Sequence, residues 1–194
     1  MFCRVLLLIL IAVALPAHAK FGDTLATNRI QLRKAMDSDL QPLEKLFTTR
    51  EMYDFYFLGE PQDPRIWIEY SRSQPSMPSR GMKSNYYVIA DQSTNEFRGI
   101  VTVIANIDLG TREVSYAIAP EFRKLGIASE ALDLVIEQAF WHDPEGVVLA
   151  TVAASNEPSQ RLLKSKGFQQ ISGFNMNMQM FELTISCERA VGGR

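Results

Sequence analysis

The residues of this chain best suited to chemistry form a basic turn, Arg123-Lys-Leu-Gly-Ile-Ala128, between a predicted strand and a predicted helix. The first N–H groups of a helix have no partner within the helix and lie at the positive end of its dipole. A loop that directs further N–H groups to the same point makes an anion site from backbone atoms. Arg123 and Lys124 add charge, and Gly126 lacks a side chain that would exclude a phosphate. The turn predicts a pyrophosphate site; the alternative is a plain connection with a solvated basic pair.

A second strand and helix follow about thirty residues later. The run Val147–Val152 is apolar and β-branched, which is typical of a buried strand. It leads to Ser155-Asn-Glu-Pro-Ser159, in which either of the first two residues can cap a helix and the proline suits the first turn. Gly167 then stands in a position typical of a helix end. This second unit favours the functional interpretation of the basic turn.

The remaining hydrophobic pattern predicts the elements that position these two turns. In chain order they are a strand at 30–36, a helix from Asp37 or Asp39 to about Thr48, a helix near 64–73, a loop at 73–84, strands at 85–91 and 97–106 joined as a hairpin, a strand at 112–119, a helix after the basic turn, and strands at 168–172 and 177–185. An antiparallel half followed by a strand-helix-strand-helix half predicts an α/β fold, with a mixed sheet and helices on both faces.

Composition excludes several classes of protein. The chain has 194 residues with 46% hydrophobic content, enough for one globular domain with its own core. Its formal net charge of −2 offers no basic surface for nucleic acid, so no nucleic-acid partner is expected. The only cysteines are Cys3 and Cys187, and the only histidines are His18 and His142. They form no metal-ligand spacing, and no metal is expected.

At these two turns the chain resembles a known family. Arg123-Lys-Leu-Gly-Ile-Ala128 matches an Arg/Gln-x-x-Gly-x-Gly/Ala motif, and Asn156-Glu-Pro-Ser159 with Lys166-Gly-Phe168 matches Asn-x-x-Ser followed by Gly-Phe. From about Ile30 to Leu183 the sequence is similar to the GNAT superfamily of acetyl-CoA-dependent N-acetyltransferases, within it to the branch of ribosomal-protein N-terminal acetyltransferases. The resemblance implies a GNAT domain at 28–185, with a mostly antiparallel sheet of six to seven strands, and a flexible tail at 186–194.

The resemblance also implies where acetyl-CoA, the acyl donor, binds. One backbone N–H on the strand before the pyrophosphate turn, near Ile118 or Ala119, would hold the oxygen that becomes negative. The implied contacts to acetyl-CoA are Ile118, Ala119, Arg123, Lys124, Leu125, Gly126, Ile127, Ala128, Ser129 and Asn156. The Asn156 amide is expected both to cap its helix and to meet the pantetheine arm.

Two polar residues are candidates for catalysis. An alkyl amine has a pKa near ~10 and attacks only as the neutral base, so a proton acceptor is needed. Glu113 matches a position where this branch often has Glu, and in strict alternation it shares a face with small residues, Ser115 and Ala117. The alternative for Glu113 is a solvated strand-end carboxylate. Many relatives carry a tyrosine where this chain has Leu163; Ser159 stands where a hydroxyl can lie near the sulfur, or is simply a first-turn helix residue.

The N-terminus matches a secretory signal. Met1–Arg4 is basic, Val5–Leu15 is aliphatic, and Pro16–Ala19 offers small residues for cleavage. A signal peptide at 1–19 predicts export to the periplasm or the medium, although acetyl-CoA is a cytoplasmic metabolite. The alternatives are an uncleaved anchor, or a misassigned start codon before a cytoplasmic protein.

Two functional classes therefore compete. The first is an N-acetyltransferase that moves the acetyl group from acetyl-CoA to a primary amine by direct attack in a ternary complex. The second is an exported GNAT-like module that binds a ligand without catalysis. The sequence identifies no acceptor, which is a protein N-terminus or a small amine in the first class, and a monomer and a homodimer both remain open.

Overall fold

The computed structural model describes residues 24–52, 54, 63–73, 76–77, 81–142, 145–175 and 177–184. The predicted signal at 1–19 and the predicted tail at 186–194 lie outside these residues. Within the described part of the chain, no helix combines the length and the apolar character that a membrane span requires.

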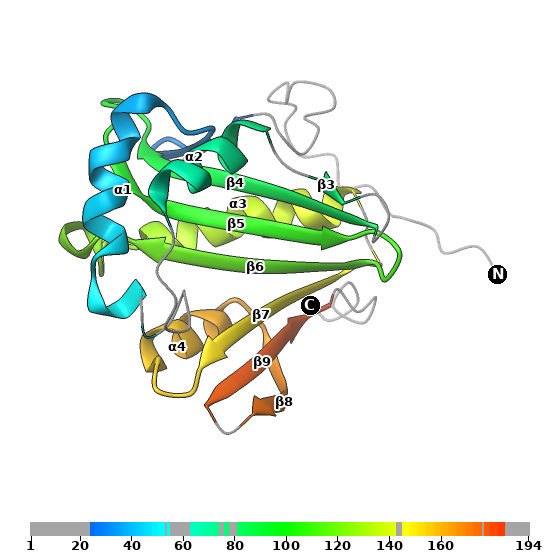
Figure 1. Ribbon diagram of the computed structural model, residues 1–194. Helices are drawn as coiled ribbons and strands as arrows, with labels where there is room; N and C mark the ends of the chain where they lie inside the picture. The colour runs from blue at the N-terminus through cyan, green and yellow to red at the C-terminus, as the bar shows by residue number, and fades with distance from the viewer. Residues whose placement is uncertain are drawn as a thin grey trace.

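The centre of the fold is a mixed sheet, mostly antiparallel (Figure 1). Among the described residues, seven strands have four or more residues, in agreement with the predicted six to seven, and two have only two residues. They are β1 (Leu25–Ala26), β2 (Ile30–Arg33), β3 (Ser76–Met77), β4 (Met82–Asp91), β5 (Phe97–Asn106), β6 (Thr111–Ile118), β7 (Val147–Ala153), β8 (Gln169–Asn175) and β9 (Met178–Leu183). The order across the sheet is β1-β2-β4-β5-β6-β7-β9-β8, with β3 beside β4. Among the described strands only β6 and β7 pair in parallel.

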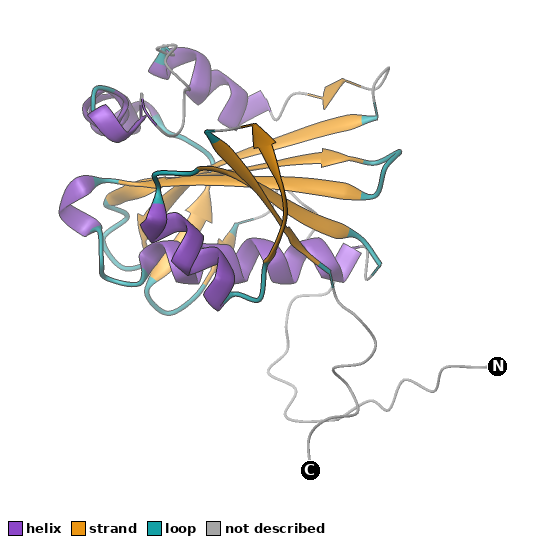
Figure 2. Ribbon diagram, turned by 90° about the horizontal axis from the view of Figure 1, so that it is seen from below, coloured by secondary structure: helices purple, strands orange, loops and turns teal. Residues whose placement is uncertain are grey.

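Helices cover both faces of the sheet, which confirms the predicted architecture (Figure 2). On one face α1 (Leu40–Phe47) and α2 (Pro64–Ser73) pack over a core that includes Val88 and Ile100. On the other face α3 (Ile127–His142) and α4 (Glu157–Ser165) contribute to a second core, which includes Val101 and Phe181. Because side chains alternate along a strand, β4, β5 and β6 supply residues to both cores.

The first predicted strand is shorter than expected, and Asp39 stands at the predicted cap position of α1 without making the side-chain cap bond. The strand ends at Arg33, whose buried guanidinium donates to both carboxylate oxygens of Asp39 at 2.7 and 2.9 Å. Asp39 also accepts from the backbone N–H of Met36 at 2.7 Å. These bonds fold the chain into a 3₁₀ turn at Asp37–Asp39, and neither aspartate caps α1 with its side chain. Asp39 instead neutralises a buried arginine.

The segment 73–84 is not a continuous loop as predicted. β3 lies within it, and β4 begins already at Met82, where Met82, Lys83 and Ser84 pair with the last residues of β5. The prolines and glycine of this segment are typical of a loop. Local composition does not show that the partner strand β5 is long enough to pair with Met82–Ser84, so the early start of β4 was missed.

The hairpin between β4 and β5 provides a prediction about pH. In its turn, Asp91 accepts from the backbone N–H of Thr94 at 2.9 Å and of Ser93 at 3.0 Å, and it pairs with Arg98 at 3.0 Å. These bonds, the Thr94 N–H first, hold the pKa of Asp91 far below its usual 3.8. The stabilisation is therefore complete above pH 3.8 and is lost as the pH falls below that value.

We expect Asp91→Ala to lower the melting temperature at pH 7, and the deficit to shrink progressively below pH 3.8. Thermal unfolding of both proteins across pH 2.5–7 measures this. A deficit that is constant over the whole range would contradict the assignment of the stabilisation to the Asp91 carboxylate.

Candidate functional site

The site begins where two neighbouring strands separate. β6 and β7 pair only at their first three residues, from Thr111 opposite Val147 to Glu113 opposite Leu149, and then diverge (Figure 1). On its other edge, β7 pairs with β9 from Val148 to Ala153. A cavity of about 660 Å³ occupies the opening, a volume in the range of small-molecule sites. Its walls come from β6, β7 and the first turns of α3 and α4.

Most of the predicted site residues line this cavity. They are Ile118, Arg123, Lys124, Gly126, Ile127, Ala128, Ser129, Asn156 and Ser159. Ala119, Leu125 and Glu113 do not line it. Apolar side chains of Val114, Val152 and Leu162 complete the walls, so the lining of the cavity combines polar and apolar groups.

The basic turn has the backbone shape of an anion site. Lys124 and Gly126 both adopt left-handed conformations, with φ of 62° and 80°. The first intrahelical bond of α3 runs from the Glu130 N–H to the Gly126 carbonyl at 3.0 Å, which leaves the N–H groups of the preceding three residues for a ligand. A Cβ on Gly126 would have only Arg29 Nη1 near it, at 3.9 Å, so the space beside this glycine is open. A phosphate group fits this cradle by charge and by shape.

The Arg123 side chain turns back toward the protein. Its Nε donates to the Ile118 carbonyl at 3.1 Å, and its Nη1 pairs with the Glu51 carboxylate at 2.9 Å. Hydrogen bonding to the backbone and then to Arg123 holds the pKa of Glu51 below its usual value, so Glu51 is ionised at neutral pH. Arg123 therefore ties the end of β6 to the segment after α1, and a carboxylate lies at the cavity wall.

Backbone geometry separates the two predicted oxyanion donors. The Ala119 N–H donates to the Arg98 carbonyl of the neighbouring chain segment at 2.9 Å, so it is engaged. Along an antiparallel strand, successive N–H groups point to opposite edges. The N–H of Ile118 therefore points to the other edge, where β7 has moved away and the cavity opens. Ile118 is the donor that the fold makes available.

Glu113 lies at the narrow end of the opening. It is exposed, it faces Leu149 in the last β6–β7 pair, and it directly precedes Val114, the first residue of β6 that lines the cavity. The structure does not bring Glu113 together with Ser159, and its role as proton acceptor stays a prediction.

The first turn of α4 forms the opposite wall. Asn156 caps this helix, as predicted, because its Oδ1 accepts from the Ser159 N–H at 3.3 Å. The Ser159 hydroxyl lies 2.7 Å from the Tyr116 hydroxyl of β6. No local sequence pattern predicts this contact, since the two residues are 43 positions apart.

Two further residues at the site have no sequence signal. Glu51 follows α1 and reaches the cavity only through the tertiary fold. Arg29, between β1 and β2, donates to the Leu125 carbonyl at 2.9 Å and pairs with Glu130 at 3.3 Å. Arg29 therefore holds the basic turn against the first turn of α3 and adds a positive charge beside Gly126.

The cap of α4 provides a second prediction. Removal of an Asn cap costs about 1 kcal/mol of stability, because a helix N–H loses its partner. We expect Asn156→Ala to lower the free energy of unfolding by about this amount, and denaturant titration measures it. Asn156→Asp, which keeps the accepting oxygen, should retain the stability; equal losses in both variants would show that the cap oxygen is not what matters.

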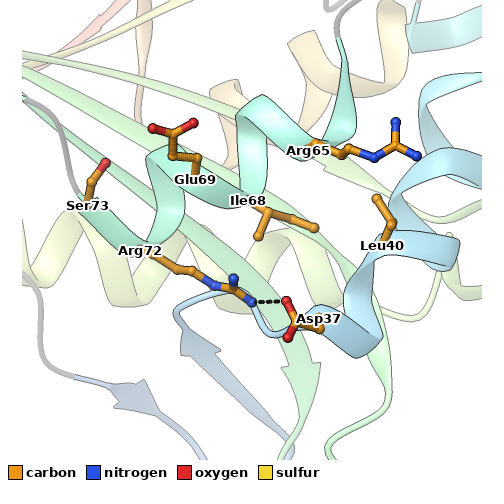
Figure 3. A pocket seen from close by; sticks show the side chains of 7 residues that line it. All are labelled: Asp37, Leu40, Arg65, Ile68, Glu69, Arg72 and Ser73. Carbon is orange, nitrogen blue, oxygen red and sulfur yellow. Dashed lines mark hydrogen bonds and ion pairs between the residues drawn. The ribbon is translucent and has the colours of Figure 1, made fainter.

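A second cavity, of about 670 Å³, lies between the 3₁₀ turn before α1 and the α2 helix (Figure 3). None of the predicted site residues lines it. Its charged groups pair locally, since Arg72 binds Asp37 at 2.7 Å and Arg65 lies 3.9 Å from Glu44. Within the described residues, no three His, Cys, Asp or Glu side chains gather as metal ligands.

Comparisons with known proteins agree with this geometry. Residues 29–169 match the family model of the acetyltransferase (GNAT) domain. The chain is 28% identical over 149 residues to the uncharacterized N-acetyltransferase YoaA of Bacillus subtilis (strain 168), which covers 75% of this chain and 82% of that protein. Two solved structures share the fold at 17% identity: the spermidine N-acetyltransferase of Vibrio cholerae in complex with CoA and spermine (TM-score 0.64, 81% of this chain and 96% of that one) and the ribosomal L7/L12 α-N-protein acetyltransferase RimL (TM-score 0.65, 84% and 94%). Since the family model spans well over half of the residues, this chain belongs to the GNAT acetyltransferase family.

Proposed function

We propose that this protein transfers an acetyl group from acetyl-CoA to a primary amine, by direct attack of the amine within a ternary complex. The observation that carries the proposal is the opening between β6 and β7. It places a free strand edge, an anion-binding turn and two helix N-termini around one cavity. Membership of the GNAT family and the CoA complex of the spermidine N-acetyltransferase support it.

The residues present fit acetyl-CoA. The left-handed turn at Lys124 and Gly126, with the first N–H groups of α3, suits a pyrophosphate. The Oδ1 atom of the Asn156 side-chain amide is used in the helix cap. The nitrogen of the same amide is placed to donate to a pantetheine carbonyl. The apolar walls at Val114 and Val152 suit the alkyl part of that arm. Bound acetyl-CoA would supply the activated carbonyl carbon.

Groups of the chain itself then stabilise the charges that develop during the transfer. The Ile118 N–H at the open edge of β6 donates to the carbonyl oxygen as it becomes negative. The Glu51 carboxylate, on the cavity wall and held by Arg123, has further lone pairs that can accept a hydrogen bond from the amine. The proton that the amine loses passes to water in the cavity or to a carboxylate such as Glu113.

Experiment must identify the class of amine that is the acceptor. The solved relatives named above act on spermidine and on a ribosomal protein N-terminus, according to their names. A protein N-terminus and a small amine are therefore the two classes that we propose for this chain.

Release of the CoA thiol tests the proposal. The full chain is incubated with acetyl-CoA and a panel of polyamines, amino sugars and peptides with free N-termini, and product mass is measured. Amine-dependent thiol release with an acetylated product is expected. Binding of acetyl-CoA without thiol release for any amine would instead favour a binding module without catalysis.

A further inference from the structure

One side-chain contact bridges the opening between β6 and α4. The Tyr116 hydroxyl, from β6, lies 2.7 Å from the Ser159 hydroxyl, in the first turn of α4. Both residues line the cavity. Tyr116 stands three residues beyond the last β6–β7 pair, about 10 Å along the strand, where the two strands no longer touch. The contact therefore lies inside the site rather than in the core beneath it.

Either hydroxyl can donate in this hydrogen bond. Burial raises the pKa of Tyr116, against the opposing effect of the bond to Ser159, so the phenol keeps its proton and is able to donate it. When Tyr116 donates, the Ser159 oxygen is the acceptor. The Ser159 backbone N–H is held by Asn156 at 3.3 Å. When Tyr116 donates to the Ser159 oxygen, the proton of Ser159 is available for another group.

The position of Ser159 is suited to a negative charge. It lies in the first turn of α4, where the helix dipole is positive. Side chains alternate along β6, so the Tyr116 side chain lies on the same face as that of Ile118, two residues before the proposed oxyanion donor. At Leu163, where many family members carry a tyrosine, the side chain is fully buried in the core and supplies no donor.

We propose that Tyr116 is a positioning residue, which orients the Ser159 hydroxyl toward the sulfur of the acyl donor; this rests on the function proposed above. In the transfer, the amine nitrogen bonds to the carbonyl carbon and the C–S bond breaks. The C–S electron pair stays on the sulfur, which leaves as a thiolate, and the amine proton passes to water. Ser159 donates a hydrogen bond to that thiolate without losing its proton, and Tyr116 also keeps its own.

Binding of two ligands tests the assignment without any turnover. The ligands are CoA and desulfo-CoA, in which hydrogen replaces the thiol, at pH 8.5, where much of a thiol with a pKa near ~8.5 is ionised. The proteins are the full chain, Tyr116→Phe, Ser159→Ala and the double variant. A hydrogen bond to a charged group predicts that the full chain prefers CoA by about 10-fold or more. Ser159→Ala should abolish the preference and Tyr116→Phe reduce it, while affinity for desulfo-CoA stays constant.

The outcomes distinguish the proposed function from the positioning role of Tyr116. Failure of the full chain to bind either ligand would overturn the proposed function, and this assignment with it. Binding with the CoA preference unchanged in Tyr116→Phe would overturn this assignment alone. Equal loss of affinity for both ligands in Tyr116→Phe would show a merely structural role and would also overturn it.

A kinetic cycle gives an independent readout once an acceptor is known. We expect kcat to fall about 10- to 100-fold in Ser159→Ala, and less in Tyr116→Phe, with KM for the amine unchanged. Because Tyr116 acts through Ser159, the double variant should equal Ser159→Ala. Ser159→Thr, which keeps a hydroxyl, should restore most of kcat. Additive losses in the double variant would contradict action through Ser159.

Discussion

Gly126→Glu is expected to abolish detectable binding of acetyl-CoA to the full chain. A carboxylate at this position would stand in the cradle where the pyrophosphate is proposed to bind, and like charges at close range repel. Gly126 also has a φ of 80°, so any side chain adds about 1–2 kcal/mol of backbone strain. Isothermal titration calorimetry measures the affinity, and thermal unfolding without ligand measures the strain.

Gly110→Glu is the matched control for this change. Gly110 is also left-handed, with φ of 62°, but it lies in the turn before β6 and does not line the cavity. Its replacement imposes the same charge and a similar strain at a distance from the site. We expect Gly110→Glu to bind acetyl-CoA with wild-type affinity. Equal affinity of the two variants would show that the basic turn is not the phosphate site.

A single methyl group on β5 is expected to lower the rate of transfer about 100-fold. A Cβ on Gly99 would lie 2.3 Å from the Ala117 carbonyl oxygen and 3.0 Å from the Ile118 Cα. Both are backbone atoms of β6, so Gly99→Ala must displace the part of the strand that carries the oxyanion donor. Overpacking of this kind costs about 1–3 kcal/mol of stability. A displacement of about 1 Å at a reacting centre costs about 10²-fold in rate.

Val88→Ala separates lost stability from displaced geometry. Val88 is fully buried on β4, pairs with Ile100 and has no contact with β6 in the strand register. Its truncation costs about 1–3 kcal/mol through a cavity in the core and leaves β6 in place. We expect kcat close to wild type in Val88→Ala, well below it in Gly99→Ala, and comparable denaturant midpoints. A wild-type kcat in Gly99→Ala would contradict the role of the Ile118 N–H as the oxyanion donor.

Local signals predicted much of the fold because they act within a few residues. Asn156 and Pro158 mark the start of α4, and the apolar run at 97–106 marks β5, so both elements agree with the structure. The cap prediction for Asp37 and Asp39 is right in position only. Asp39 stands at the N-cap of α1, but its carboxylate binds the buried Arg33 instead of the helix N–H groups, and an aspartate before a helix suits both uses.

The cavity residues were predictable to the extent that they lie in one continuous turn. The turn at Arg123–Ser129 is local, and all of it except Leu125 lines the cavity. Glu51 and Tyr116 reach the same cavity from distant parts of the chain. Their contacts, with Arg123 and with Ser159, are made only in the folded protein, where β6 and β7 separate. The choice between Ile118 and Ala119 likewise required the register of β5 and β6.

Export through the segment 1–19 stays a prediction.

Thermal unfolding of the full chain with and without acetyl-CoA tests the central claim most directly. Ligand at a hundredfold excess over Kd stabilises the native state by about 2.7 kcal/mol. For a chain of this size, that predicts a rise in melting temperature of about 5–10 °C. A rise of this size, absent with an unrelated protein in the same titration, is the predicted result. A melting temperature unchanged up to millimolar acetyl-CoA would contradict the assignment of the β6–β7 opening as an acyl-donor site.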